Sequence, residues 1–176
     1  MKNFYYILGA LVILLVLASM VVAVGGSFMD PTHRAEVTSH INAPPDSIFA
    51  LITDYRNYSS WRKDLLRVEM LPPRDTIQSW REFDKDKNNW AFEAIEVTPP
   101  SYLKVKIAEP TSPIQGTWMI SIITDGTGSI VNVIEEATVT NVFFRFIANV
   151  FMSDTATIEA YLASLASRFG QTLIFK

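Results

Sequence analysis

The sequence contains no cysteine among its 176 residues. This absence excludes disulfides, thiolate metal sites, a cysteine nucleophile and lipid attachment through a cysteine. It leaves the compartment open, because a chain without cysteine tolerates an oxidising or a reducing environment.

Histidine is also scarce, since the chain has only His33 and His40. Two histidines are too few for most metal sites or catalytic triads, so we predict no metal, no cofactor and no catalytic set. His40 lies on the same face of a predicted strand as Glu36 and Thr38, because side chains two residues apart point to the same side. We therefore expect it on the solvent face.

Basic runs are missing as well. The formal net charge is −3, and the lysines and arginines are scattered along the chain. A nucleic-acid-binding protein usually concentrates positive charge on one face, so we predict no nucleic-acid partner.

One long apolar run is present at the start of the chain. No residue from Phe4 to Val24 is charged, and a helix needs about 20 such residues to cross roughly 30 Å of hydrocarbon. We predict that residues 1–25 form a transmembrane anchor, which makes the chain a single-pass membrane protein with the membrane as a partner. The alternative is a cleavable signal peptide, whose apolar region is usually shorter, about 7–15 residues.

The charges flanking this run say little about orientation. Lys2 precedes it, and Asp30, His33 and Arg34 follow it, so the count of positive charges is nearly balanced. A short N-terminal head before a single span slightly favours a domain outside the cytoplasm.

Residues 26–33 are rich in turn formers and predict a linker, and residues 34–176 then form one domain. The domain begins with a predicted strand over 34–42, which ends at prolines. Two short helices are predicted next, the first after Pro45 and the second from Tyr55 to Trp61. Segments separated by proline, glycine and asparagine turns, including Pro72–Pro73, then predict six further strands, at 65–71, 77–83, 90–97, 102–108, 117–124 and 129–139.

The C-terminal part predicts an amphipathic helix. Ile158, Leu162 and Leu165 belong to one apolar stripe at helical spacing, and Tyr161 lies on the same stripe. Together these elements predict an α+β fold, a curved antiparallel sheet of about seven strands around a long C-terminal helix.

Large aromatic side chains lie on the predicted sheet and can line an apolar pocket facing this helix. The predicted ligand-binding residues are Trp80, Trp90, Phe92, Trp118, Ile158, Leu162 and Leu165. The alternative is that the same rings are ordinary core.

Short motifs at the start of the domain carry a resemblance. The run Ile41–Phe49, followed by Leu51–Asp54 and Trp61, resembles the opening of the polyketide cyclase/dehydrase and lipid-transport family of the START-like (SRPBCC, helix-grip) superfamily. The resemblance implies a fold with a hydrophobic tunnel, which different members use for sterols, phospholipids, polyketides, plant hormones or quinones. It implies no common catalytic set, and none is carried over.

Two further features remain open. Glu135 and Glu136 must point to opposite sides of one strand, so one of them can face the pocket. The segment Val142–Met152 is apolar nearly all round, which fits a buried helix, a membrane-surface helix or a helix at the entrance of the pocket.

These observations favour membrane-anchored binding of a lipid or other hydrophobic small molecule, and transport or presentation of that ligand is one use that such binding can have. One alternative is a cyclase-like or hydrolase-like enzyme acting on a hydrophobic substrate. Another is a ligand-free interaction module at the membrane.

Overall fold

The computed structural model describes residues 2–151 and 155–175. The chain forms the elements α1 (Lys2–Phe28), β1 (Thr32–Ile41), α2 (Pro45–Thr53), η1 (Tyr55–Ser60), β2 (Leu65–Arg74), β3 (Ile77–Asp84), β4 (Asn89–Thr98), β5 (Tyr102–Ile107), β6 (Ile114–Asp125), β7 (Gly128–Val139), α3 (Val142–Phe151) and α4 (Ala156–Arg168). The predicted α+β architecture is confirmed.

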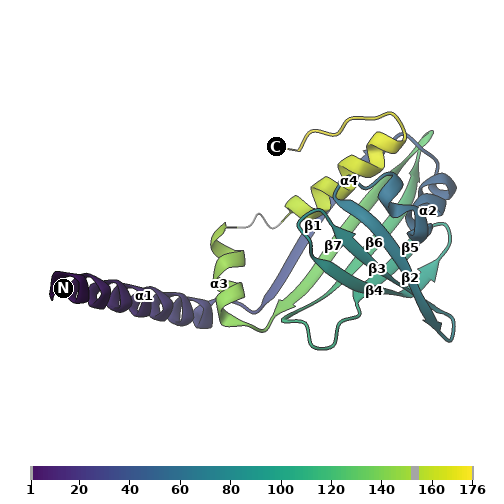
Figure 1. Cartoon of the computed structure of the whole chain (residues 1–176). Helices are drawn as coiled ribbons and strands as arrows, with labels where there is room; N and C mark the ends of the chain where they lie inside the picture. Colours follow the sequence, from purple (N-terminus) through teal and green to yellow (C-terminus); the bar gives the residue numbers. More distant parts are fainter. Residues whose placement is uncertain (1, 152–154, 176) are drawn as a thin grey trace.

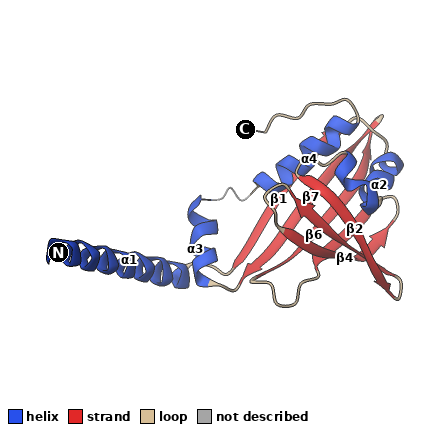
Figure 2. Cartoon of the chain, in the orientation of Figure 1, coloured by secondary structure: helices blue, strands red, loops and turns tan. Residues whose placement is uncertain are grey.

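The strands form one antiparallel sheet in the order β1-β7-β6-β5-β4-β3-β2. The sheet curves around α4, and Figures 1 and 2 show α4 lying across its inner face. Thr32 and Val139 mark the end of the sheet that adjoins α1 and α3, which we call the α1 end; the opposite end is the far end.

One strand boundary differs from the prediction. Pro72 and Pro73 were expected to separate two strands, yet both lie within β2. β2 is an edge strand, so only one of its sides pairs with another strand. Proline, which has no N–H group, is tolerated there because its nitrogen does not have to donate to a neighbouring strand. The pairing of β2 with β3 is irregular between Leu71 and Arg74, where the prolines lie.

The far end of the domain is closed by aliphatic packing. The side chains of Ile41, Leu103, Val131, Leu162 and Leu165 are 0% exposed. Gln171 fixes the end of α4 to β1, because its side chain donates to the His40 carbonyl (2.8 Å) and accepts from the Asn42 N–H (2.9 Å).

The first helix projects away from the domain (Figure 1). Residues Asn3–Phe28 are long and apolar enough to cross a membrane, and the most apolar part of this stretch has no buried side chains. The helix continues through Gly25 and Gly26, so it extends past the residue at which we expected the linker to begin.

The predicted helix over Val142–Met152 corresponds to α3, and Met152 lies outside the described residues. α3 packs against the C-terminal end of α1. A Cβ atom on Gly26 would clash with the carbonyl oxygen of Val142, and one on Gly25 would lie 2.9 Å from the Phe146 ring. The two helices therefore approach closely because both positions are glycine.

We predict that Gly26→Val separates α3 from α1. Trypsin should then cleave after Arg145 about tenfold faster, equivalent to ~1.4 kcal/mol of lost local stability. The measurement is a digestion time course of the full chain in detergent micelles. Gly9→Val is the matched control, because a Cβ there meets nothing within 4 Å, and equal rates for both variants would contradict the prediction.

Candidate ligand site between the sheet and α4

A group of aromatic rings fills part of the space between the sheet and α4. The Tyr55 ring stacks on Trp80 with centroids 3.9 Å apart, and the Tyr58 ring meets Trp80 edge-on at 6.1 Å. Trp61 packs edge-on against Tyr161 of α4 at 5.4 Å. Sequence reasoning assigned no site role to these η1 rings. Their spacing of three residues was the available signal, because side chains at i and i+3 eclipse on a 3₁₀ helix.

Six of the seven predicted ligand-binding residues belong to the core or pack against it, and the seventh, Trp90, pairs across the strands with Glu82. Trp80, Ile158, Leu162 and Leu165 are at most 1% exposed and belong to the core. Trp90, Phe92 and Trp118 are only partly buried. The structure brings Trp80 within 5.9 Å of Phe92 and Trp118 within 5.3 Å of Tyr161. Contact with a ligand remains a prediction for each of them.

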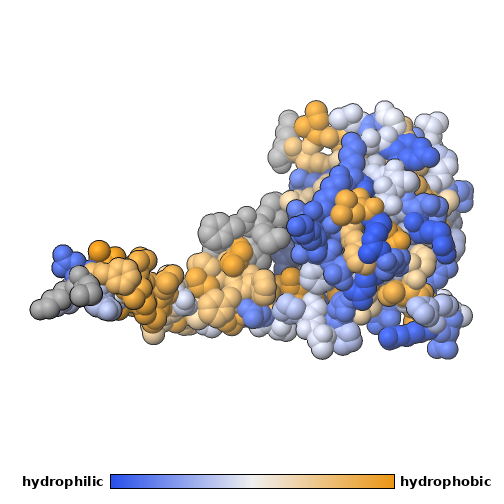
Figure 3. All heavy atoms as spheres, viewed as in Figure 1, coloured by the Kyte–Doolittle hydropathy of each residue, from blue (hydrophilic) through white to orange (hydrophobic). Residues whose placement is uncertain are grey.

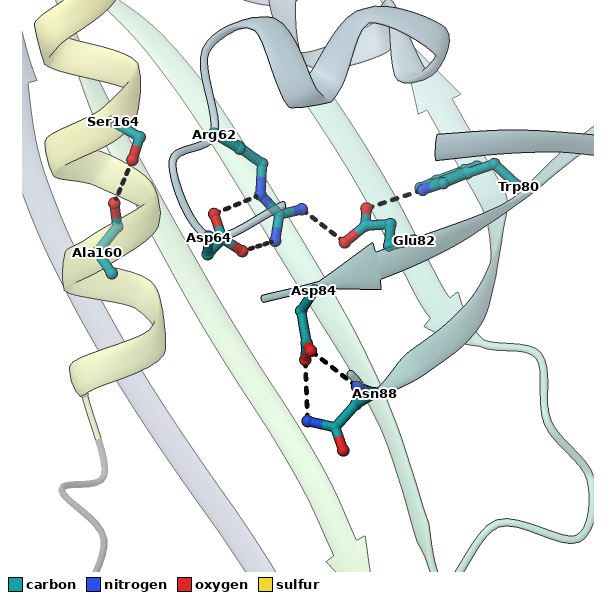
Figure 4. Close-up of polar contacts among 8 residues, drawn as sticks. All are labelled: Arg62, Asp64, Trp80, Glu82, Asp84, Asn88, Ala160 and Ser164. Atoms are coloured by element: carbon teal, nitrogen blue, oxygen red, sulfur yellow. Dashed lines mark hydrogen bonds and ion pairs between the residues drawn. The ribbon is translucent and has the colours of Figure 1, made fainter. Parts of the chain in front are cut away.

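A buried ion pair lies beside the rings (Figure 4). Arg62 follows η1, and its Nη1 donates to Glu82 Oε2 on β3 at 2.8 Å. The same guanidinium contacts Asp64 (2.6 Å from Nη2 to Oδ2), and the Trp80 indole N–H donates to Glu82 Oε1 at 2.9 Å. The Arg62 and Glu82 side chains are 15% and 7% exposed. Charge-assisted bonds of this kind hold the η1 segment against β3.

Burial raises the pKa of Glu82 above its ordinary value, although Arg62 and the Trp80 indole favour the charged form. The folded chain therefore binds a proton at Glu82 more tightly than the unfolded chain does. The contribution of Glu82 to stability is largest below its unfolded pKa and falls as the pH rises through its folded pKa.

A second carboxylate lies on the inner face of the sheet, towards the α1 end. Glu135 pairs across the strands with Ala35 and Trp118, and Trp118 packs on α4. Burial raises the pKa of Glu135, while His33 and a hydrogen bond from Trp118 oppose this rise. Glu136 points to the outer face, where its carboxylate lies 3.7 Å from Arg34, so the two acids are on opposite sides, as expected.

Two buried polar atoms near the rings have no hydrogen-bond partner among the described residues. They are the Tyr161 hydroxyl oxygen and the Trp61 indole nitrogen. Tyr58, by contrast, donates to the Ile52 carbonyl at 2.5 Å. Burial raises the pKa of Tyr161, which keeps its hydroxyl protonated as a donor. Leaving a buried donor unpaired costs about 1–3 kcal/mol, so a ligand that accepts hydrogen bonds from these groups gains affinity.

The outer face carries a separate, shallow hollow of about 570 Å³. It lies at the α1 end over β1, β5, β6 and β7, and its charged lining residues include Arg34, Lys106 and Glu136. The predicted ligand-binding residues do not line it. We place the candidate site on the inner face, because the outer hollow is open and its charges are already paired: Arg34 with Glu136, and Lys106 with Glu93 at 2.9 Å.

His40 takes no part in the inner face. Its side chain is 45% exposed and its Nε2 lies 3.6 Å from Asp125. This agrees with its expected position on the solvent side of β1.

Residues 32–170 match the family model described as polyketide cyclase / dehydrase and lipid transport. Among curated proteins, no sequence matches significantly.

Solved structures with the same architecture include three proteins of low sequence identity. The di-domain ARO/CYC StfQ from the steffimycin biosynthetic pathway matches with a TM-score of 0.64 and 13% identity, over 80% of this chain and 53% of that chain. This chain thus spans about half of that protein. The Zhui aromatase/cyclase from Streptomyces sp. R1128 matches with a TM-score of 0.62 and 13% identity, over 78% and 93% of the two chains. A START superfamily protein from Mycobacterium smegmatis matches with a TM-score of 0.59 and 15% identity, over 77% and 96%. At these identities the likeness shows a shared fold.

We predict that Arg62→Met lowers the free energy of unfolding by about 3–5 kcal/mol at pH 7, because it leaves Glu82 buried without its cation. The loss should be smaller at pH 5 than at pH 7, because burial raises the pKa of Glu82 and a lower pH favours its neutral form, which does not need the cation. Urea unfolding of the full chain in micelles at both pH values measures this effect.

The matched control is Arg34→Met, which removes the exposed pairs with Glu36 and Glu136 and should cost at most about 1 kcal/mol. A loss at Arg62 no larger than that of the control, or one independent of pH, would contradict the role given to the buried pair.

Proposed function

Since this chain belongs to the polyketide cyclase / dehydrase and lipid transport family, we propose that it binds a lipid or another hydrophobic small molecule. The binding place is the inner face of the sheet at the α1 end, against the first turns of α4. The apolar helix α1 anchors this site to a membrane.

The observation that carries the proposal is a change in burial along the inner face of β5 and β6. Towards the far end, Leu103 and Ile120 are 0% and 3% exposed. Towards the α1 end, Trp118 is only partly buried although it is apolar. An apolar surface that stays partly open beside a packed core is the usual lining of a hydrophobic ligand site.

The polar groups beside this surface suit the polar end of an amphiphile. The Tyr161 hydroxyl and the Trp61 indole N–H are unpaired donors among the described residues. A ligand carbonyl, hydroxyl or ester oxygen can accept from them while its apolar body covers Trp118 and Phe92. This arrangement favours a molecule with a long apolar part and few polar atoms over a fully polar metabolite.

Anchoring increases the encounter rate with such a ligand. A molecule dissolved in the bilayer is held near the site at a high effective concentration when α1 tethers the domain to the same membrane. A role in transporting or presenting the ligand follows from this position. The side of the membrane on which the domain lies remains a prediction from the sequence, with a slight preference for the extracytoplasmic side.

An enzymatic role is the second candidate, and Glu135 is the observation that favours it. This carboxyl group is half-buried beside Trp118 and has a raised pKa, as general acids often have. A cyclase-like or hydrolase-like reaction would need Glu135 within reach of the substrate. A third reading, a ligand-free interaction module, is supported by the rings that already fill part of the interior.

The test of the proposed function is native mass spectrometry with lipid extraction on the full chain, purified from its host in a mild detergent. We expect a hydrophobic species bound in a ratio of one per chain that survives detergent removal in the gas phase. A ligand-free mass, together with no binding to a panel of host lipids, would contradict the proposal and favour a ligand-free interaction module.

We predict that Trp118→Ala weakens binding of the co-purifying species roughly tenfold or more, since a central aromatic contact is often worth over ~1.4 kcal/mol. Phe83→Ala is the control, because this ring lies on the outer face of the same sheet, under Arg67. Fluorescence titration of both variants measures the affinity, and thermal unfolding measures stability. Equal affinities, or a Trp118→Ala defect confined to stability, would contradict the assignment.

A further inference from the structure

The short helix α3 is held in a fixed position at the end of α1. The Arg145 guanidinium donates from Nη1 to the Gly26 and Met29 carbonyls (3.3 and 3.4 Å). Its Nε and Nη2 donate to the Val139 carbonyl at the end of β7 (3.1 and 3.0 Å). A cation at these positions pairs the free carbonyls at the C-terminal end of α1 and interacts favourably with its dipole.

The start of α3 is equally well defined. The Asn141 side-chain oxygen accepts from the backbone N–H groups of Phe143 (2.9 Å) and Phe144 (3.2 Å), which caps the helix. The close approach at Gly25 and Gly26 adds backbone contact between α1 and α3. The orientation of α3 relative to α1 is therefore set by contacts on both sides of Arg145.

This orientation leaves one apolar face of α3 uncovered. Val142, Arg145 and Phe146 face α1 and the end of β7. Phe143, Phe144 and Ile147, on the other side, are 45%, 52% and 48% exposed. Large apolar side chains grouped on one helix face mark an interaction surface.

The length of α1 determines the depth at which this face of α3 lies in a membrane that α1 spans. The uncharged run from Phe4 to Val24 is 21 residues long, or about 31 Å at 1.5 Å per residue, and matches the hydrocarbon thickness of a bilayer. Gly25 and Gly26 follow directly, so α3 joins α1 where hydrocarbon gives way to headgroups. Figure 1 shows α3 running across the axis of α1, and such a helix lies along the membrane surface when α1 spans it.

The apolar surface is continuous between the two helices. In Figure 3 the hydrophobic surface of α1 reaches the place where α1 joins the domain, and Phe28 there is 87% exposed. When α1 spans a bilayer, the lipid therefore lies next to the exposed face of α3. This continuity favours lipid over a protein partner as the occupant of that face.

We propose that α3 is a membrane-surface helix that inserts Phe143, Phe144 and Ile147 into the leaflet from which α1 emerges. The proposal rests on the anchoring part of the proposed function and not on ligand binding. With α1 and α3 both in the leaflet, the domain cannot turn freely about its anchor, and the α1 end of the sheet faces the lipid. The partly open inner face is then presented to the bilayer in one orientation.

The absence of cysteine allows a direct test with the full chain. Single cysteines at Phe144→Cys and Ile147→Cys carry an environment-sensitive fluorophore, in vesicles of phosphatidylcholine with a minor share of phosphatidylglycerol. Leu8→Cys in α1 reports the anchor. Asn149→Cys, on the other side of α3, and Thr127→Cys, in the exposed β6–β7 turn at the far end, are the controls. The readouts are quenching by acyl-chain nitroxide lipids and by aqueous iodide.

We expect the labels at 144 and 147 to be quenched by the nitroxide lipids several-fold more than those at 149 and 127, and to be shielded from iodide. If 144 and 147 behave like 127, or are shielded from both quenchers by a second copy or another protein, the proposal is overturned. A Leu8→Cys label that nitroxide lipids do not quench overturns the anchor itself. If that label is quenched and those at 144 and 147 are not, only the role of α3 fails, and ligand binding is judged separately by mass spectrometry.

Discussion

The inner face of the sheet is longer than the helix that covers it. This difference in length determines which end of the domain is closed and which end stays partly open. α4 has 13 residues, about 20 Å of helix, whereas β6 and β7 have 12 residues each, roughly 40 Å of strand. The helix is attached to the far end of the sheet through Gln171, so closure is complete there. At the α1 end, other side chains have to cover apolar sheet, and part of it stays exposed.

The aromatic residues of η1 supply much of that additional cover. Tyr55 and Tyr58 contact Trp80 from above the sheet, and the ion pair of Arg62 with Glu82 ties the end of this segment to β3. A buried ion pair contributes little net stability compared with apolar packing, yet it fixes geometry because either partner alone would be a buried charge. The wall of the candidate site is therefore positioned by electrostatics as much as by ring packing.

The contacts at the α1 end connect the domain to the apolar helix α1. Arg145 bonds to carbonyls of α1 and of the last strand, and the α1 glycines allow α3 to pack closely. The candidate ligand site, α3 and the C-terminal end of α1 consequently occupy one end of the molecule. In the proposed reading, a bilayer at that end would be the source or the destination of the ligand.

Local patterns in the sequence were enough to determine the long apolar helix α1, the strands, the apolar stripe of α4 and the family, because periodicity and turn residues act over short distances. They also placed Trp80, Phe92 and Trp118 on one face, and Glu135 opposite Glu136. Only the tertiary structure decided which rings are core, that Arg62 pairs with Glu82 and that α3 packs on α1. These features depend on contacts between residues far apart in the chain, and no local period encodes such contacts.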